Sequence, residues 1–212
     1  MSMHIGIIGS GTVGTTLARG FANCGHAVTL GTRHPADHQA LEPAVHVASF
    51  ADAARAGEVL LLAVKWSAID DVLALAGPAN FAGKVLIDTS NPLVYRDGRP
   101  AAIELPAAGS AAQLLAAVLP ETRIVKAFNT VGAGLMVDPD LPGGPPDMFV
   151  CGDDEAAKAL VARLCADVRY PAYDVGPLAR AAELEHLAFL WITIALRGTT
   201  GGHAFTLLRR NP

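Results

Sequence analysis

Three closely spaced glycines near the start of the chain have the spacing of a phosphate-binding turn. They make the pattern G-x-G-x-x-G between an apolar segment (4–8) and a segment with helical apolar spacing (12–24). In this context the first glycine allows a tight turn, the second lets the backbone approach a pyrophosphate, and the third lets helix and strand pack closely. The free N–H groups at the positive end of the helix would hold the phosphates. The predicted dinucleotide contacts are Gly9, Ser10, Gly11, Thr12, Val13 and Gly14; the alternative is a glycine-rich turn without a ligand.

The second apolar segment ends in residues that suit a 2′-phosphate. Proteins that bind NAD usually carry Asp or Glu about 20 residues after the glycine turn, where the carboxylate holds the ribose 2′-OH. This chain has Gly31, Thr32, Arg33 and His34 there instead. A carboxylate would repel a 2′-phosphate, whereas Arg33 can offer it a planar charged fork and Thr32 a hydroxyl. This segment predicts NADP(H) rather than NAD(H), unless Arg33 is an ordinary surface arginine.

Polar residues follow three further apolar segments. They form one pair after each segment: Val64 and Lys65, Asn91 and Pro92, and Asn129 and Thr130. The carboxyl ends of the strands in an open α/β sheet meet at one edge, where ligands bind. We therefore expect these residues to line the ribose, the nicotinamide carboxamide or a second substrate. The second pair is also a good turn start and the third a good helix cap, so both structural interpretations stay open.

No general acid or base stands out in the sequence. There is no Ser–His–Asp pattern, no H-E-x-x-H motif and no pair of carboxylates at helical spacing near the predicted crevice. His26 precedes the second apolar segment and is expected to be structural, whereas His186 and His203 have no evident place. Hydride transfer between two organic redox cofactors needs positioning, because the cofactors supply the chemistry. We expect no metal site and assign no catalytic residue.

The elements that must position these residues alternate between short apolar runs and helical patterns. Several runs are apolar at consecutive positions, which is typical of parallel strands covered by helices on both faces. The alternation predicts an α/β fold: a doubly wound, mostly parallel sheet of the Rossmann type with a C-terminal helical appendage. The predicted strands are 4–8, 27–30, 45–47, 59–64, 85–87, 124–127 and 148–150.

Local signals mark the helices and loops between these strands. Residues 67–70 resemble a capping box at the start of a helix that Gly77-Pro78 ends. Asp153 can cap a later helix. Residues 89–108 hold no evident regular element, and the Pro/Gly-rich residues 138–147 must form a loop.

The final helical pattern, residues 178–196, starts amphipathic and becomes apolar all round after His186. A helix that is apolar all round must be covered on more than one side. We expect it to pack on the body of the protein or to pair two subunits of a homodimer. The chain therefore divides into an NADP-binding domain (1–176) and a C-terminal helix and tail (177–212).

The composition narrows the class of protein. Of the 212 residues 51% are hydrophobic and 17% are charged, which predicts a sizeable core. The net charge of −4, without a run of Lys or Arg, argues against a nucleic-acid surface. The apolar stretch 187–196 is too short to span a bilayer, and no leader precedes the first strand. The three cysteines lack metal spacing, so we expect buried free thiols and a cytoplasmic protein.

These segments resemble a known family over nearly the whole chain. Residues 5–14, 31–33, 63–66, 126–130, 149–154 and 203–209 are similar to the NADPH-dependent deazaflavin (coenzyme F420) reductases and to the cytosolic domain of the STEAP metalloreductases. The resemblance implies that the glycine turn holds the pyrophosphate and that Thr32 and Arg33 hold the 2′-phosphate. It also implies that a second cofactor stacks near the nicotinamide, beside residues 91–92 and 129–130.

Two positions depart from the deazaflavin enzymes. Asn129 stands where those enzymes tend to carry His, and Lys65 stands where Pro is common before the Trp. The Asn-Thr version is similar to the metalloreductase domain. The departures leave the prediction of NADPH intact and the hydride acceptor open.

Three functions fit these observations. The first is an NADP(H)-dependent oxidoreductase that transfers a hydride between NADPH and a flavin, a deazaflavin or a similar small-molecule acceptor. The second is an imine or hydroxyacid reductase, which would need a substantial helical second domain that the residues after 176 are too few to form. The third is an NADP(H)-binding sensor or scaffold without turnover. Tyr95, Arg96 and Arg99 within 89–108 favour a second ligand but could equally form a partner surface.

Overall fold

The strands that the apolar runs predict all form, and they build one sheet. The computed structural model describes residues 2–38, 44–199, 202–208 and 210. Each of the seven predicted strands is present, with its ends shifted by no more than two residues. The sheet has eight strands in the order β10-β9-β8-β5-β4-β1-β2-β3. They are β1 (His4–Ile8), β2 (Ala27–Thr32), β3 (Val45–Ser49), β4 (Val59–Leu62), β5 (Val85–Asp88), β8 (Arg123–Lys126), β9 (Met148–Gly152) and β10 (Ala172–Asp174).

Six of these strands, from β3 to β8 in the sheet order, run parallel. The last two run the opposite way, because β9 pairs antiparallel with β8 and parallel with β10. The predicted doubly wound, mostly parallel sheet is therefore confirmed. The sequence reasoning missed β10, which is only three residues long.

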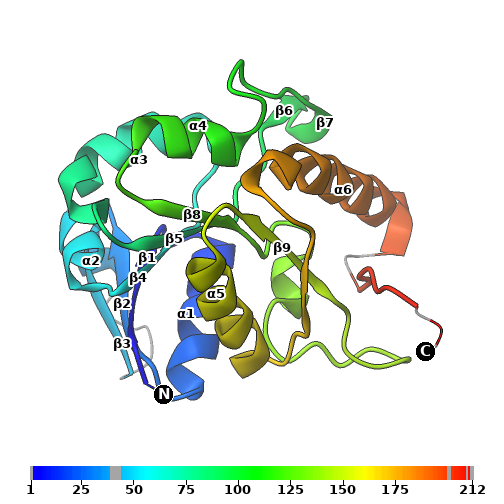
Figure 1. Cartoon of the computed structure of the whole chain (residues 1–212), viewed down its shortest axis with the longest axis horizontal. Helices are drawn as coiled ribbons and strands as arrows, with labels where there is room; N and C mark the ends of the chain where they lie inside the picture. The colour runs from blue at the N-terminus through cyan, green and yellow to red at the C-terminus, as the bar shows by residue number, and fades with distance from the viewer. Residues whose placement is uncertain (1, 39–43, 200–201, 209, 211–212) are drawn as a thin grey trace.

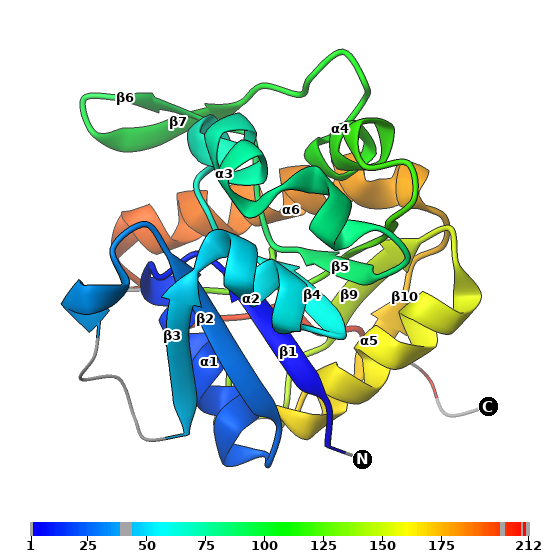
Figure 2. The same ribbon diagram turned by 90° about the vertical axis from the view of Figure 1, so that its left-hand side faces the viewer.

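Helices cover both faces of the sheet (Figures 1 and 2). They are α1 (Thr12–Asn23), α2 (Phe50–Ala56), α3 (Ile69–Ala76), α4 (Ala111–Val118), α5 (Glu155–Asp167) and α6 (Ala181–Ile194). The buried residues of α1 and α5 belong to one apolar cluster, and those of α2, α3, α4 and α6 belong to a second. Both faces of the central strands are therefore buried, which explains why their sequences are apolar at consecutive positions.

Two predicted helix starts differ from the structure. Ser67 lies in a 3-10 turn (Trp66–Ala68), and α3 starts after Ala68 without a side-chain cap. The predicted capping box at residues 67–70 was therefore wrong. The α5 helix is capped by Asp154, whose carboxylate accepts from the Ala157 N–H at 2.7 Å. Asp153 instead accepts from the Leu178 N–H at 2.8 Å. This bond joins the residue that follows β9 to the segment that leads into α6. The end of α3 at Gly77, with φ of 76°, is as predicted.

The segment 89–108 is more regular than its sequence indicated. It contains a hairpin of β6 (Leu93–Arg96) and β7 (Arg99–Ile103), which pair antiparallel. Its two-residue turn has positive φ at Asp97 (51°) and Gly98 (75°), as a type I′ turn requires. Residues 138–147 form the predicted loop, with no helix or strand.

The C-terminal helix α6 is buried along its first half only. Leu184, Glu185 and Ala188 are buried, whereas Leu190 is 51% exposed and Leu196, in the wide turn that follows α6, is 55% exposed. The described part of the chain therefore covers one side of this apolar helix and leaves another open. Among the described residues, no helix has the length and apolar character needed to span a membrane.

Candidate functional site

The carboxyl ends of the central strands line up in one row. The pairing register places Gly31, Ile8, Leu62, Asp88 and Lys126 side by side across β2, β1, β4, β5 and β8. Each predicted contact residue comes at most six positions after the row residue of its strand. Thr32 is the last residue of β2, and the others come after the ends of their strands. The five separate segments that the sequence singled out therefore meet at one edge of the sheet.

Two of the three glycines in the first turn are required by the protein itself. Gly9 has φ of 125°, and a Cβ there would overlap the Ala63 carbonyl. A Cβ on Gly14 would overlap the carbonyl oxygen of Gly9. These contacts explain the tight turn and the close approach of α1 to β1.

Gly11 differs from its neighbours because none of the described residues crowds it. It precedes α1 with φ of −72°, and a Cβ there would meet no atom within 4 Å. The first N–H groups of a helix have no partners within the helix, and the first turn of α1 carries no acidic residue. An open glycine beside these N–H groups fits a pyrophosphate that must approach the backbone closely.

The end of β2 adds polar side chains to the same place. Thr32 is 5% exposed, and its hydroxyl oxygen accepts from the Ser10 hydroxyl at 3.0 Å. The neighbouring Arg33 is exposed and makes no ion pair within the described chain. The end of β2 therefore brings together a pair of bonded hydroxyls, from Ser10 and Thr32, directly before the exposed Arg33.

Known proteins share the sequence and fold around this edge. Residues 4–92 match the family model described as NADP oxidoreductase, coenzyme F420-dependent. The crystal structure of a candidate F420-dependent NADP reductase from Arthrobacter sp. FB24 has a TM-score of 0.89 and 36% identity, covering 98% of this chain and 100% of that one.

The chain belongs to the F420-dependent NADP oxidoreductase family. It is 32% identical to the metalloreductase STEAP3 of Rattus norvegicus over 85% of this chain and 35% of that protein. It is 29% identical to the F420-dependent NADP reductase of Methanocaldococcus jannaschii over 71% of this chain and 68% of that protein. The chain thus spans about a third of the length of the STEAP metalloreductases that it matches. This NADP oxidoreductase family is the one that the sequence motifs indicated.

Asn91 and Asn129 bond to each other beside the row of strand ends. The Asn129 amide donates to Asn91 Oδ1 at 3.0 Å and to the Leu184 carbonyl at 3.0 Å. The Asn91 amide donates back to the Asn129 carbonyl at 3.1 Å. Asn129 Oδ1 is buried without a hydrogen-bond partner among the described residues. The pair therefore joins the end of β5, the end of β8 and α6.

The backbone before Asn129 has an unusual conformation. Phe128 has φ of 60°, which is rare for a bulky residue, and its ring is fully buried. Such a conformation costs about 1–3 kcal/mol and persists only where the surroundings impose it. No helix begins at Asn129 or Thr130, because a 3-10 turn starts only at Ala133. The helix-cap interpretation of this pair was therefore wrong.

The remaining predicted residues lie around this pair with different exposure. Lys65 is exposed and Val64 is half-buried after β4, and Pro92 and Thr130 are buried after β5 and β8. The turn-start interpretation of Asn91-Pro92 holds locally, since the Leu93 N–H donates to the Asn91 carbonyl at 2.8 Å. The same residues therefore serve the fold and lie at the candidate site.

A buried ionic network beneath the asparagine pair was not foreseen. Lys126 Nζ donates to Asp88 Oδ2 at 2.7 Å, to the Ser90 carbonyl at 2.5 Å and to Glu185 Oε1 at 2.8 Å. All three charged side chains are 0% exposed. Glu185 also accepts from the N–H of Ala111, the first residue of α4, at 3.0 Å. The network joins β5, β8, α4 and α6. In the sequence it is signalled only by a lysine at the end of an apolar strand and a glutamate within an apolar helix.

The network also has unequal charges, with two carboxylates for one ammonium. Burial raises the pKa of Glu185 by more than Lys126 lowers it. Asp88 and Lys126 bond to each other, so neither is free to act as an acid or base at the strand ends.

His26 and the three cysteines have structural roles or lie at the surface, whereas His34 is exposed at the end of β2, beside Arg33. His26 is buried and bonds to Asp167 at 3.1 Å, as a structural histidine would. Cys151 and Cys165 are buried free thiols as predicted, and burial raises the pKa of Cys151 to about 12. Cys24 is exposed, which contradicts the expected burial. It follows α1 at the surface, where its thiol donates to the Asp167 carbonyl.

Proposed function

We propose that the turn at residues 9–14 and the Thr32–Arg33 pair bind NADP(H) and position it for hydride transfer. The observation that carries the proposal is Gly11, where the described part of the chain leaves room for a side chain and yet the residue is glycine. The pyrophosphate would lie against the first N–H groups of α1, and Arg33 would pair with the 2′-phosphate. Val64 and Lys65 would line the ribose, and the pair of the half-buried Asn91 and the buried Asn129 would face the carboxamide. NADPH, when bound, supplies the hydride.

We propose a flavin, a deazaflavin or a similar planar cofactor as the hydride acceptor. Two observations support this choice. The buried titratable groups at the strand ends, Asp88 and Lys126, are held in bonds to each other, which suits a transfer that needs positioning rather than a side-chain acid. The family model and the archaeal relative are both described by coenzyme F420. The alternatives are an NADP(H) sensor without turnover and an imine or hydroxyacid reductase.

A panel of acceptors tests this proposal. The purified protein and NADPH would be combined in turn with FAD, FMN, a deazaflavin, ferric chelates and cyclic imines, and NADPH oxidation would be followed by absorbance. Steady turnover with a flavin or deazaflavin is the expected result. Tight NADPH binding with no turnover against the whole panel would establish the sensor instead, and turnover confined to imines would establish the imine reductase.

Arg33→Ala should weaken NADPH binding by about 1.5–3 kcal/mol, the usual effect of losing a charged hydrogen bond. This corresponds to a roughly 10–150-fold higher Kd, measured by titration of nucleotide fluorescence. NADH binding should change little, because NADH has no 2′-phosphate. Arg33→Lys is the matched variant: it keeps the charge but loses the planar fork, so its effect should be intermediate. Equal wild-type affinities for NADPH and NADH would refute the assignment.

We further propose a cytoplasmic homodimer that pairs through the open side of α6. The free thiols support a reducing compartment, and the exposed Leu190 and Leu196 support an apolar contact. In this proposal residues 1–176 form the nucleotide-binding domain and 177–212 contribute the dimer face.

Leu190→Glu should convert the dimer to a monomer, because it places a charge in the apolar contact. Light scattering over a range of protein concentrations would measure the mass. Leu75→Glu is a matched control, since Leu75 on α3 is 55% exposed and lies outside the proposed contact. A wild-type mass that stays monomeric at all concentrations would exclude the dimer.

A further inference from the structure

Two arginines face each other at the tip of the β6–β7 hairpin. The register pairs Arg96 with Arg99 across the turn of Asp97 and Gly98. Residues directly opposite in an antiparallel pair lie on the same face of the strands, and like charges in this arrangement are destabilising. The hairpin therefore places two arginine side chains on one face, at a cost in stability from their like charges.

Nothing in the described chain neutralises this pair of charges. Both arginines are exposed, and neither makes an ion pair within the described residues, not even with the neighbouring Asp97. Some surface arginines are paired, such as Arg55 with Asp52 and Arg180 with Glu183. Arg33 and Arg163 are also exposed without an ion pair among the described residues, so what distinguishes Arg96 and Arg99 is their placement directly opposite each other. The adjacent Tyr95 is 50% exposed, and as the preceding residue of the strand it points to the opposite face from Arg96. Two unpaired guanidinium groups on one face of the hairpin suit an anionic ligand.

The base of the hairpin lies at the candidate site. It begins directly after Asn91-Pro92, and the Glu104 N–H closes its base by donating to the Pro92 carbonyl at 2.9 Å. Its strand β7 packs against α6, and both views show the hairpin standing out from the body beside that helix (Figures 1 and 2). Five residue steps, about 16 Å of extended chain, separate Asn91 from Arg96. This spacing suits a ligand whose charged end lies away from its reacting ring.

We propose that Arg96 and Arg99 bind the phosphate ester of a flavin acceptor whose ring lies near the Asn91–Asn129 pair. The proposal rests on the proposed function, because it assigns the acceptor of that same site. The two guanidinium groups bind the phosphate in forks of hydrogen bonds, and the ligand charge removes their mutual repulsion. The oxidoreductase therefore prefers phosphorylated flavins to flavins that lack a phosphate.

FMN and riboflavin test this proposal, since they share one ring system and differ by the phosphate. Quenching of flavin fluorescence would give the Kd of each with the protein saturated with NADP⁺. The wild type should bind FMN at least about tenfold more tightly than riboflavin, as expected for charged hydrogen bonds. The double variant Arg96→Gln/Arg99→Gln should lose this preference and keep the riboflavin affinity. Inorganic phosphate should compete with FMN and not with riboflavin.

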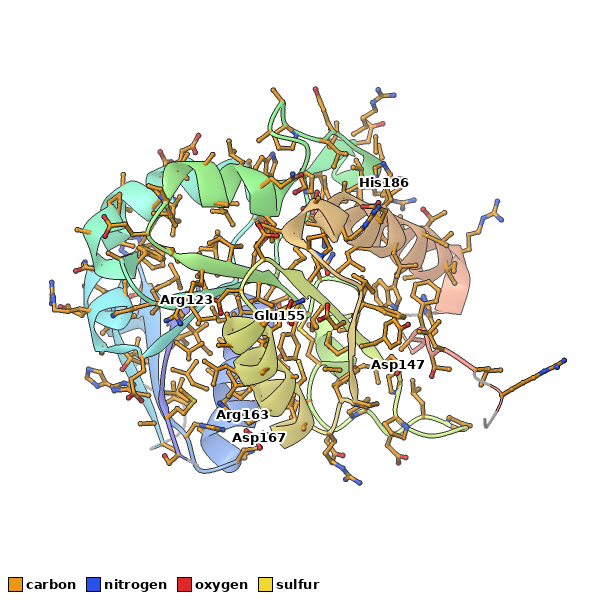
Figure 3. The ribbon with its side chains drawn as sticks, viewed as in Figure 1. Arg123, Asp147, Glu155, Arg163, Asp167 and His186 are labelled. Carbon is orange, nitrogen blue, oxygen red and sulfur yellow. The ribbon has the colours of Figure 1, made fainter. Side chains whose placement is uncertain are left out.

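Arg163→Gln is the matched control variant. Arg163 is also an exposed arginine. It lies on α5, far from the hairpin and from α6, the helix that carries His186 (Figure 3). This control should keep the FMN preference. Equal binding of FMN and riboflavin by the wild type, or an unchanged preference in the double variant, overturns the proposal. A weaker affinity for NADPH in the double variant also overturns it, because the arginines would then bind the nucleotide.

Failure of this proposal differs from failure of the proposed function. If the protein oxidises NADPH with FMN and riboflavin equally well, the function stands and the arginine site is wrong. If NADPH binds but neither flavin binds or is reduced, the arginine site is wrong, and only the remaining acceptors of the panel can rescue the function.

Discussion

Lys126→Met is expected to lower the free energy of unfolding by about 3–5 kcal/mol. Removing one partner of a buried ion pair has this effect because it leaves the other charges buried without compensation. Here the substitution leaves two carboxylates, Asp88 and Glu185, in a site where all three groups are 0% exposed. Denaturation with urea, followed by circular dichroism, would measure the loss. A change below about 1 kcal/mol, the value typical of a surface pair, would contradict the network.

Two further variants distinguish the effect of buried charge on stability from the effect of side-chain shape. Glu185→Gln should cost less than Lys126→Met, because the amide oxygen can still accept from the Ala111 N–H and from Lys126. Combining Lys126→Met with Glu185→Gln and Asp88→Asn should recover part of the loss, since no buried charge then lacks a partner. If the triple variant were less stable than Lys126→Met alone, shape rather than charge would account for the loss.

The network also gives the stability a pH dependence. Burial lowers the pKa of Lys126, but the two carboxylates outweigh it, and the net pKa is raised above the ordinary 10.5. A group whose pKa is higher in the folded state adds stability that is fully present below its unfolded pKa. That stability is lost as the pH rises through the folded pKa. The wild type should therefore lose stability above pH 10.5 more steeply than Lys126→Met does.

Gly11→Ala should weaken NADPH binding while the protein keeps its stability. A Cβ at Gly11 meets no protein atom within 4 Å, and φ of −72° suits any residue, so folding should be unaffected or slightly favoured. The methyl group would instead occupy space that the pyrophosphate needs. Inserting a methyl group into a packed contact costs about 1–3 kcal/mol, a roughly 5–150-fold rise in Kd. Nucleotide titration and thermal denaturation of the same sample would measure both quantities.

Two glycine variants serve as controls for this prediction. Gly134→Ala also adds a Cβ in open space, but in the 3-10 turn at residues 133–135, so it should change neither property. Gly14→Ala should lower stability, because its Cβ would overlap the Gly9 carbonyl. If Gly11→Ala bound NADPH as the wild type does, the pyrophosphate would not lie against this turn.

The doubly wound, mostly parallel sheet could be predicted because the central strands are apolar on both faces and the crossovers between them are long enough for helices. The β6–β7 hairpin was missed because Tyr95, Arg96 and Arg99 break the apolar alternation. Asp97-Gly98 is nevertheless a strong signal for a type I′ turn and could have revealed it. The α5 cap was placed one residue too early because two aspartates stand side by side, and only the bond from Leu178 N–H decides between them.

The candidate site likewise contains residues that the sequence could reveal and residues that it could not. The glycine turn and Thr32–Arg33 were accessible to sequence reasoning because local spacing defines them. The Lys126 network was not, since its three charged groups come from residues 88, 126 and 185, and nothing local in the sequence selects these partners. Likewise, the bond from Asn129 to the Leu184 carbonyl depends on how α6 docks.

The position of Glu185 has a consequence for the order of folding. Its partners Lys126 and Ala111 precede it by 59 and 74 residues in the chain. While the chain is being synthesised, the sheet can therefore pair its strands before Glu185 is available, with Lys126 held by only one carboxylate. Contacts between distant residues form slowly because they close long loops. Docking of α6 is therefore expected to be a late step, and until it occurs neither the ammonium nor the start of α4 has its full set of partners.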